Sequence, residues 1–150
     1  MTNDSEPRTV TVGELRVNAT VENLRKVSEF VRGLGKQLGL AEGIVFDIDL
    51  ALEEAAANIV RHAYEPGRPG DLLVRVETID GLLRITLTDW GIPLDPNKVT
   101  TFDNSASVET RARGGTGLHI IYGLMDEVSR KTALAPGGPN VLILSKQVER

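Results

Sequence analysis

Apolar residues recur along the chain with two different periods. Helical spacing of three or four residues predicts amphipathic helices over residues 21–38 and 41–64, and a shorter one over 116–125. Alternation of apolar and polar residues predicts five strands. These strands are expected at residues 8–15, 71–78, 82–88, 127–132 and 141–147.

Turn residues separate these segments. Pro66–Gly70 ends the second helix, and Asp80-Gly81 is typical of a tight hairpin. From Trp90 to Gly114 the chain loses periodicity, which predicts a long functional or mobile loop, extending as a lid from about Pro93. The order of elements predicts an α+β fold, a two-layer α/β sandwich. Its sheet is expected to be mixed but mostly antiparallel, with three helices on one face.

Composition narrows the class of protein. The 150 residues, 41% of them hydrophobic, suffice for one domain, expected at residues 8–150 after a disordered segment at 1–7. The net charge of −4 and the pI near 5.2 argue against a nucleic-acid surface. Cysteine is absent and only His62 and His119 are present, so disulfides are excluded and a zinc centre is poorly supplied.

Targeting signals are also missing from the sequence. The first seven residues are polar and acidic, unlike a signal peptide. No apolar run approaches the roughly 20 residues that a membrane-spanning helix needs. A soluble, cytoplasmic protein without membrane contact is therefore expected.

Glu54 and Asn58 are the first candidate functional pair. They are four residues apart, so they lie on one face of the second predicted helix, whereas Glu53 points about 100° away. Asn58 offers an amide oxygen to Mg²⁺, and a neighbouring carboxylate could take a proton from an attacking group. Taken alone, a solvated polar helix face is the commoner explanation, since amphipathic helices routinely carry polar stripes.

Asp89 and Gly91 form the second candidate feature. Asp89 ends an alternating strand, where a carboxylate can accept a hydrogen bond from the amino group of adenine. Gly91 would let the base approach the backbone. Asp and Gly also commonly open a turn, and for this pair alone that use is the more frequent one.

A glycine-rich segment is the third feature. Gly114-Gly115-Thr116-Gly117 precedes a helical pattern, so backbone amides and the helix N-terminus could bind an anion. Arg111 and Arg113 could add charge-assisted contacts to phosphate. The segment matches neither the Rossmann nor the Walker pattern. A flexible loop leading into a helix is an equal alternative for this segment alone.

The order and spacing of the three features resemble the Bergerat nucleotide fold of the GHKL superfamily, shared by gyrase, Hsp90, histidine kinases and MutL proteins. Within it, the chain is most similar to the small anti-sigma factor serine/threonine kinases that regulate bacterial stress and sporulation sigma factors. The likeness covers roughly residues 41–146. The segments that carry it are Glu54–Asn58 with His62–Tyr64, Asp89–Pro93, Gly115–Ile120, Met125–Val128 and Gly138–Lys146.

This resemblance implies that the chain binds ATP with Mg²⁺. It makes Glu54 the general base, Asn58 the Mg²⁺ ligand, Asp89 the adenine-binding acid and Gly91 its close neighbour. Pro93 departs from the family pattern, because it stands at the second glycine of an Asp-x-Gly-x-Gly box. Proline stiffens the loop and removes a donor, so a lid there is expected to close differently.

The resemblance also assigns the phosphate-binding residues. Arg113 lies two positions before the first glycine of the phosphate box, a place from which a basic residue of relatives can reach the terminal phosphate. The nucleotide-binding residues of the box itself are Gly115, Thr116, Gly117 and Leu118.

The function implied by the resemblance is that of a kinase that sequesters a sigma factor and phosphorylates an anti-anti-sigma protein, with a homodimer as the expected assembly. A nucleotide-dependent binding module without phosphoryl transfer is the alternative. Glu54 favours the kinase, because a pure clamp has little need of a base beside the metal ligand. A detached histidine-kinase catalytic domain is the third possibility. It is the least favoured, because His62 lies within the nucleotide helix and no helix pair with a phospho-accepting histidine precedes it.

Overall fold

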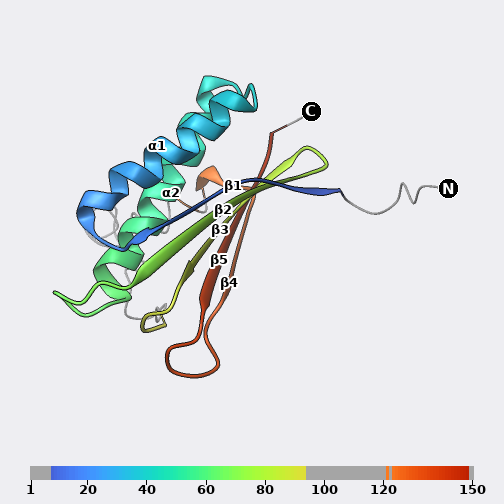
Figure 1. Cartoon of the computed structure of the whole chain (residues 1–150). Coiled ribbons are helices and arrows are strands. Elements are labelled where there is room, and N and C mark those ends of the chain that lie inside the picture. The colour runs from blue at the N-terminus through green and yellow to red at the C-terminus, as the bar shows by residue number, and fades with distance from the viewer. Residues whose placement is uncertain (1–7, 94–120, 122, 149–150) are drawn as a thin grey trace, which may run out of the picture.

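The computed structural model describes residues 8–93, 121 and 123–148. Two helices cover one face of a five-stranded sheet, as Figure 1 shows. The opposite face of the sheet carries neither of these helices. In chain order the elements are β1 (Thr9–Asn18), α1 (Val21–Gln37), α2 (Glu42–His62), β2 (Asp71–Ile79), β3 (Leu82–Asp89), β4 (Glu127–Lys131) and β5 (Asn140–Gln147).

The strands of the sheet lie in the order β1-β2-β3-β5-β4, and every pairing between them is antiparallel. The expectation of a mixed sheet is therefore wrong for the described strands. Between β1 and β2 the chain passes through two consecutive helices, which return it to the end of the sheet that it left, so β2 runs opposite to β1. Asp80 (φ 44°) and Gly81 (φ 85°) both have positive φ, as the predicted β2–β3 hairpin requires.

The predicted number of helices also needs correction. The described residues contain two full helices, α1 and α2, instead of three. Ile121, Gly123 and Leu124 are helical, but most of the third predicted helix, over 116–125, lies outside the described residues. Within the described part of the chain, no helix combines the length and the apolar character needed to cross a bilayer.

The core lies between the helices and the covered face of the sheet. Residues of β3 alternate strictly between half-buried and buried positions, so one face of this central strand points at the helices. Ile48 and Leu52 of α2 meet this face and are at most 1% exposed. Full burial of one such side chain contributes about 1.5–3 kcal/mol. This core holds α2 and β3 in fixed relative positions, and these two elements carry Asn58 and Asp89.

Candidate functional site

Asn58 of α2 and Asp89 at the end of β3 lie in the wall of one pocket. Both side chains are polar yet almost completely buried, with 2% and 4% of their surface exposed. The structure thus brings together two residues that sequence analysis proposed from separate motifs. The pocket has a free volume of about 20 Å³, so a base needs a wider opening than this structure provides. The remaining lining residues are Ala55, Ile59, Ile121, Arg130, Thr132, Asn140, Val141 and Leu142.

The Asp89 carboxylate is held by a hydrogen-bond network. Its Oδ1 accepts from the backbone N–H of Gly91 and from Asn140 Nδ2, each at 3.0 Å. Asn140 Nδ2 also donates to the Gly91 carbonyl at 3.0 Å, while Asn140 Oδ1 accepts from the Ala133 N–H at 2.9 Å. Within the described residues nothing donates to Asp89 Oδ2. That oxygen is therefore the acceptor that Asp89 can offer to a ligand.

Burial is the largest influence on the charge of Asp89. It raises the pKa of this carboxyl above its ordinary value. The hydrogen bonds from Asn140 and Gly91 lower the pKa, and the positive charge of Arg130 lowers it further, but burial outweighs them. The carboxylate therefore sits in an environment that makes its charge costly and its hydrogen bonds strong.

Asn58 carries an unsatisfied donor. Its Oδ1 accepts a hydrogen bond from Arg61 Nη2 at 2.8 Å. Its Nδ2 is buried and has no partner among the described residues. A buried polar group without a hydrogen bond costs about 1–3 kcal/mol. Such a cost at the wall of a pocket indicates that a ligand or water completes the bonding of this amide.

Glu54 lies one helical turn before Asn58 on α2 and is half-buried. It does not line the pocket that contains Asn58 and Asp89. The pKa of its neighbour Glu53 is raised by burial and by the charges of Asp49 and Glu54, and lowered by Arg32 of α1. The two adjacent carboxylates therefore influence one another through their charges.

Gly91 is required by the protein backbone itself. A Cβ atom at this position would lie 2.0 Å from the carbonyl oxygen of Ala63, which follows α2. The next residue, Ile92, donates its N–H to that same oxygen at 2.7 Å. The close contact between this loop and the end of α2 explains the glycine, whereas its predicted approach to a base stays a prediction.

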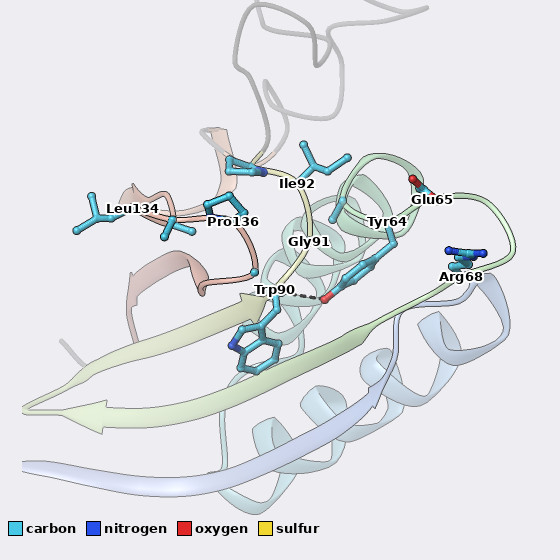
Figure 2. A pocket seen from close by; sticks show the side chains of 13 residues that line it. Tyr64, Glu65, Arg68, Trp90, Gly91, Ile92, Leu134 and Pro136 are labelled. Carbon is cyan, nitrogen blue, oxygen red and sulfur yellow. Dashed lines mark hydrogen bonds between the residues drawn. The ribbon is translucent and has the colours of Figure 1, made fainter.

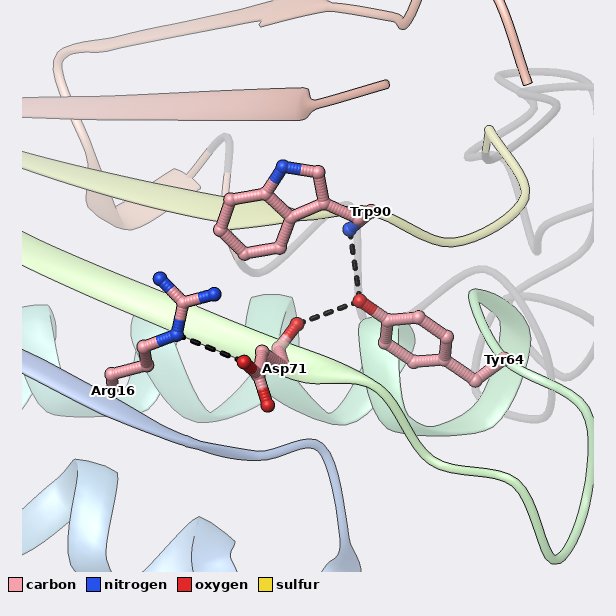
Figure 3. Close-up of polar contacts among 4 residues, drawn as sticks. All are labelled: Arg16, Tyr64, Asp71 and Trp90. Atoms are coloured by element: carbon pink, nitrogen blue, oxygen red, sulfur yellow. Dashed lines mark hydrogen bonds and ion pairs between the residues drawn. The ribbon is translucent and has the colours of Figure 1, made fainter. Parts of the chain in front are cut away.

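Tyr64 forms a second link between α2 and the end of β3. Its hydroxyl donates to the Asp71 carbonyl at 2.7 Å and accepts from the Trp90 N–H at 2.8 Å (Figure 3). Arg16 of β1 pairs with the Asp71 carboxylate at 2.9 Å and stacks on the Trp90 ring at 4.9 Å from its centroid. The residue directly after Asp89 is therefore fixed from two sides.

A larger hollow adjoins this loop. It has a volume of about 640 Å³, and Figure 2 shows Tyr64 and Trp90 joined by their hydrogen bond, with the Gly91–Ile92 loop beside them. Ile92 and Leu134 are largely exposed on its wall, so the hollow is mainly apolar. Sequence analysis did not predict this hollow, which forms where the ends of α2 and β3 meet the loop between β4 and β5.

The third predicted motif cannot be compared with the structure. Arg113 and the phosphate-box residues lie outside the described residues, as does nearly all of the predicted lid. The box residues concerned are Gly115, Thr116, Gly117 and Leu118.

Sequence analysis missed three residues that shape the pocket or the loop beside it: Asn140, Arg130 and Tyr64. Asn140 had one local signal, because it is a polar residue on the inward face of an otherwise apolar strand, β5. Its pairing with Asp89 depends on the register between β3 and β5, where the two residues are direct partners. Tyr64 belongs to a segment that carries the family resemblance, but nothing in that segment indicated its contact with Trp90, and Arg130 gave no signal.

The fold and the site place this chain in a known class of nucleotide-binding proteins. Residues 17–146 match the family described as the histidine kinase-like ATPase domain, and the chain belongs to that family. This match confirms the family that the sequence predicted. The kinase function predicted from that family is supported by the relatives named below.

Named relatives within this class are serine-protein kinases. The chain is 30% identical over 119 residues to the serine-protein kinase RsbW of Bacillus thuringiensis (strain Al Hakam), an alignment that covers 77% of this chain and 74% of the relative. It is 29% identical over 121 residues to RsbW of Staphylococcus aureus (strain bovine RF122 / ET3-1), covering 77% and 76%.

Solved structures share the fold at lower identity. The RsbU and RsbW domains of a Mycobacterium tuberculosis protein align with a TM-score of 0.62 at 21% identity, covering 92% of this chain but only 33% of that chain. The SiaB–SiaC complex of Pseudomonas aeruginosa aligns with a TM-score of 0.60 at 16% identity, covering 88% of both chains. At these identities the likeness concerns the fold alone.

Proposed function

We propose that this protein is an ATP-dependent serine/threonine kinase of the anti-sigma factor type. One observation carries the proposal: Asn58 and Asp89, each buried, meet in one pocket of a histidine kinase-like ATPase domain, and no described residue accepts from the Asn58 amide. The RsbW relatives are serine-protein kinases, which supports serine as a target residue.

The chemistry of the pocket residues suits a nucleotide. Asp89 accepts the adenine amino group at Oδ2, the oxygen that receives no hydrogen bond from the described residues. Asn140 holds the other carboxylate oxygen, so the acceptor keeps its direction. Gly91 lies beside Asp89, and its close contact with Ala63 keeps the loop next to the end of α2.

The residues also suit Mg²⁺ held jointly with a nucleotide. Asn58 supplies one amide oxygen, the ligand type that Mg²⁺ accepts while keeping waters and phosphate oxygens. The described residues contain no group of three or more His, Cys, Asp or Glu that could hold a metal. Mg²⁺–ATP, when bound, supplies the transferable phosphoryl group and the cation that offsets its charge.

Glu54 takes the proton of the incoming hydroxyl in this proposal. It lies one turn before Asn58 and is half-buried, and a carboxylate placed near the metal ligand can act as a general base. Arg113, Gly115, Thr116, Gly117 and Leu118 complete the site as phosphate-binding residues.

The partners and assembly follow from the same family. The protein sequesters a sigma factor, phosphorylates an anti-anti-sigma protein, acts in the cytoplasm and forms a homodimer. Residues 8–150 form one ATP-binding domain. A nucleotide-dependent clamp without phosphoryl transfer remains the alternative that experiment must separate from the kinase.

Calorimetry with ATP and Mg²⁺ tests the nucleotide site. Asn58→Ala is expected to weaken binding of Mg²⁺–ATP by at least tenfold, because water cannot position the metal equally well. ATP measured in EDTA is expected to bind both proteins alike. Unchanged Mg²⁺–ATP affinity would remove Asn58 from the site.

Incubation with γ-labelled ATP, Mg²⁺ and a candidate anti-anti-sigma protein encoded beside this chain tests the kinase. Labelled phosphoserine or phosphothreonine on the partner is the expected result. If ATP changes how tightly the partner binds while no label is transferred, the clamp is the correct function.

A further inference from the structure

The only hydrogen bond that the described residues make to the Asn58 side chain comes from Arg61. Arg61 lies three residues later on α2, a spacing that brings side chains together on a helix. Its Nη2 lies 2.8 Å from Asn58 Oδ1, the oxygen that the proposed function assigns to Mg²⁺. The same atom is therefore taken by a guanidinium in this structure.

Arg61 also fixes which way the amide points. A guanidinium has donors only, so the amide must turn its oxygen toward Arg61 and its NH₂ group away from it. This accounts for the buried Nδ2 without a partner among the described residues. The orientation leaves this donor unsatisfied by the described residues but directs Oδ1 toward Arg61.

A metal ion and Arg61 cannot share this oxygen easily. Mg²⁺ binds oxygen at about 2.1 Å, so both cations would lie within about 5 Å of one another. Their repulsion, together with competition for the same lone pairs, makes the two states exclusive. Arg61 is exposed, so its guanidinium can move into water at little cost.

We propose that Arg61 is a positioning residue that occupies the metal-binding oxygen of Asn58 until Mg²⁺–nucleotide displaces it. The inference rests on the proposed role of Asn58 as metal ligand. Arg61 has two opposing effects: it holds the oxygen outward, and it competes with the metal. Without Arg61 the amide could adopt two orientations, which would lower the affinity for the metal by at most about a factor of two. The charge-assisted hydrogen bond from Arg61 lowers that affinity by more than this, so competition dominates.

Arg61→Met tests the proposal, because methionine keeps the helix propensity and the apolar stem while removing donor and charge. Binding of Mg²⁺–ATP is expected to tighten about 3- to 10-fold. Binding of ATP in EDTA should stay unchanged. Arg25→Met on α1 removes an equally exposed positive charge elsewhere and serves as the matched control, with neither affinity altered.

Two further measurements separate competition from other roles. In an Asn58→Ala background, Arg61→Met should no longer change Mg²⁺–ATP affinity. In the nucleotide-free protein, the NMR signals of the Asn58 side-chain amide should shift in Arg61→Met and stay in place in Arg25→Met.

Each other outcome overturns the inference. Weaker ATP binding by Arg61→Met, both with Mg²⁺ and in EDTA, would mean that the guanidinium contacts phosphate. If Arg61→Met leaves Mg²⁺–ATP affinity unchanged while Asn58→Ala still weakens Mg²⁺–ATP binding, the proposed function stands and Arg61 does not compete with the metal. A parent protein that binds no ATP would overturn both the proposed function and the proposed role of Arg61.

Discussion

The hydroxyl of Tyr64 accepts a hydrogen bond from the backbone N–H of Trp90 at 2.8 Å and so joins the segment after α2 to the residue that follows Asp89. The same hydroxyl donates to the Asp71 carbonyl at 2.7 Å. Burial raises the pKa of Tyr64 above its ordinary value, so the hydroxyl stays protonated at neutral pH and keeps this donor. One side chain thus couples the helix that carries Asn58 to the loop beside Asp89.

Tyr64→Phe should lower the free energy of unfolding by about 1–3 kcal/mol, because a partly buried N–H and a carbonyl lose their partner. It should also weaken ATP binding, since the loop beside Asp89 loses one of its two links to the end of α2. Denaturant unfolding and calorimetry measure the two effects. Arg16→Met is the control: it removes an exposed ion pair and a cation–π contact to the same cluster and should cost less than about 1 kcal/mol.

The second link between the end of α2 and the loop beside Asp89 is the close contact of Gly91 with Ala63, which gives a prediction about this glycine. Gly91→Ala should destabilise the protein by about 1–3 kcal/mol, because the new methyl would overlap the Ala63 carbonyl oxygen and backbone atoms would have to move. Gly33→Ala in α1 is the matched control, since a Cβ there meets nothing within 4 Å. This control should stabilise the protein by about 0.5–1 kcal/mol through helix propensity. Equal unfolding midpoints for the two variants would contradict the close contact.

Local periodicity predicted most of the fold. The bounds of α1, α2 and four strands agree with prediction to within one or two residues, because alternation and helical spacing directly reflect which side chains face the core. β1 is longer than predicted, extending to Asn18, because its last residues pair with the start of β2. Its register shift between Thr11 and Gly13 depends on the partner strand and has no local signal.

The candidate site was predicted only in part, for the same reason. Asn58 and Asp89 belong to short motifs whose residue types suggest their chemistry. Asn140 reaches Asp89 across 51 residues of sequence, and Arg130 acts on it from β4, so both depend on strand order. The contact between Gly91 and Ala63 likewise requires α2 to be packed on the sheet before it can be recognised.

Asp89→Asn should separate stability from binding. Asparagine can still accept the hydrogen bonds from Gly91 and Asn140 but carries no charge to bury, so the variant should be at least as stable as the parent at pH 7. ATP affinity should fall at least tenfold, because an amide nitrogen at the Oδ2 position cannot accept from adenine. Equal affinity of the parent for ATP and GTP would refute the adenine contact.

The difference in stability between the parent and Asp89→Asn should depend on pH in a direction that the pKa of Asp89 determines. The pKa of Asp89 is raised by folding, so between the unfolded value near 3.8 and the higher folded value the native state binds more protons than the unfolded state. The contribution of Asp89 to stability is therefore present below the unfolded pKa and is lost as pH rises through the folded pKa. The parent should gain stability relative to Asp89→Asn as pH falls through this window, and ATP affinity should fall in the same window. Denaturant unfolding of both proteins at a series of pH values measures the first effect.

Glu54→Gln distinguishes the kinase from the clamp. Glutamine keeps the size and hydrogen bonding of the side chain but cannot take a proton from an incoming hydroxyl. Mg²⁺–ATP and the partner protein should bind nearly as well as they bind the parent. Phosphoryl transfer to the partner should fall by roughly 10²–10⁴-fold, the usual contribution of general-base catalysis.

Glu53→Gln is the matched control for this experiment, because it removes the same charge from the adjacent carboxylate, whose charged neighbours are Asp49, Arg32 and Glu54 itself. Transfer by this variant should stay within about twofold of the parent. Equal losses in the two variants would mean that the charge of the helix, rather than one base, supports transfer. If the parent transfers phosphate and Glu54→Gln transfers it equally fast, the protein is a kinase whose base is not Glu54, because a required proton acceptor cannot be replaced by an amide without loss of rate.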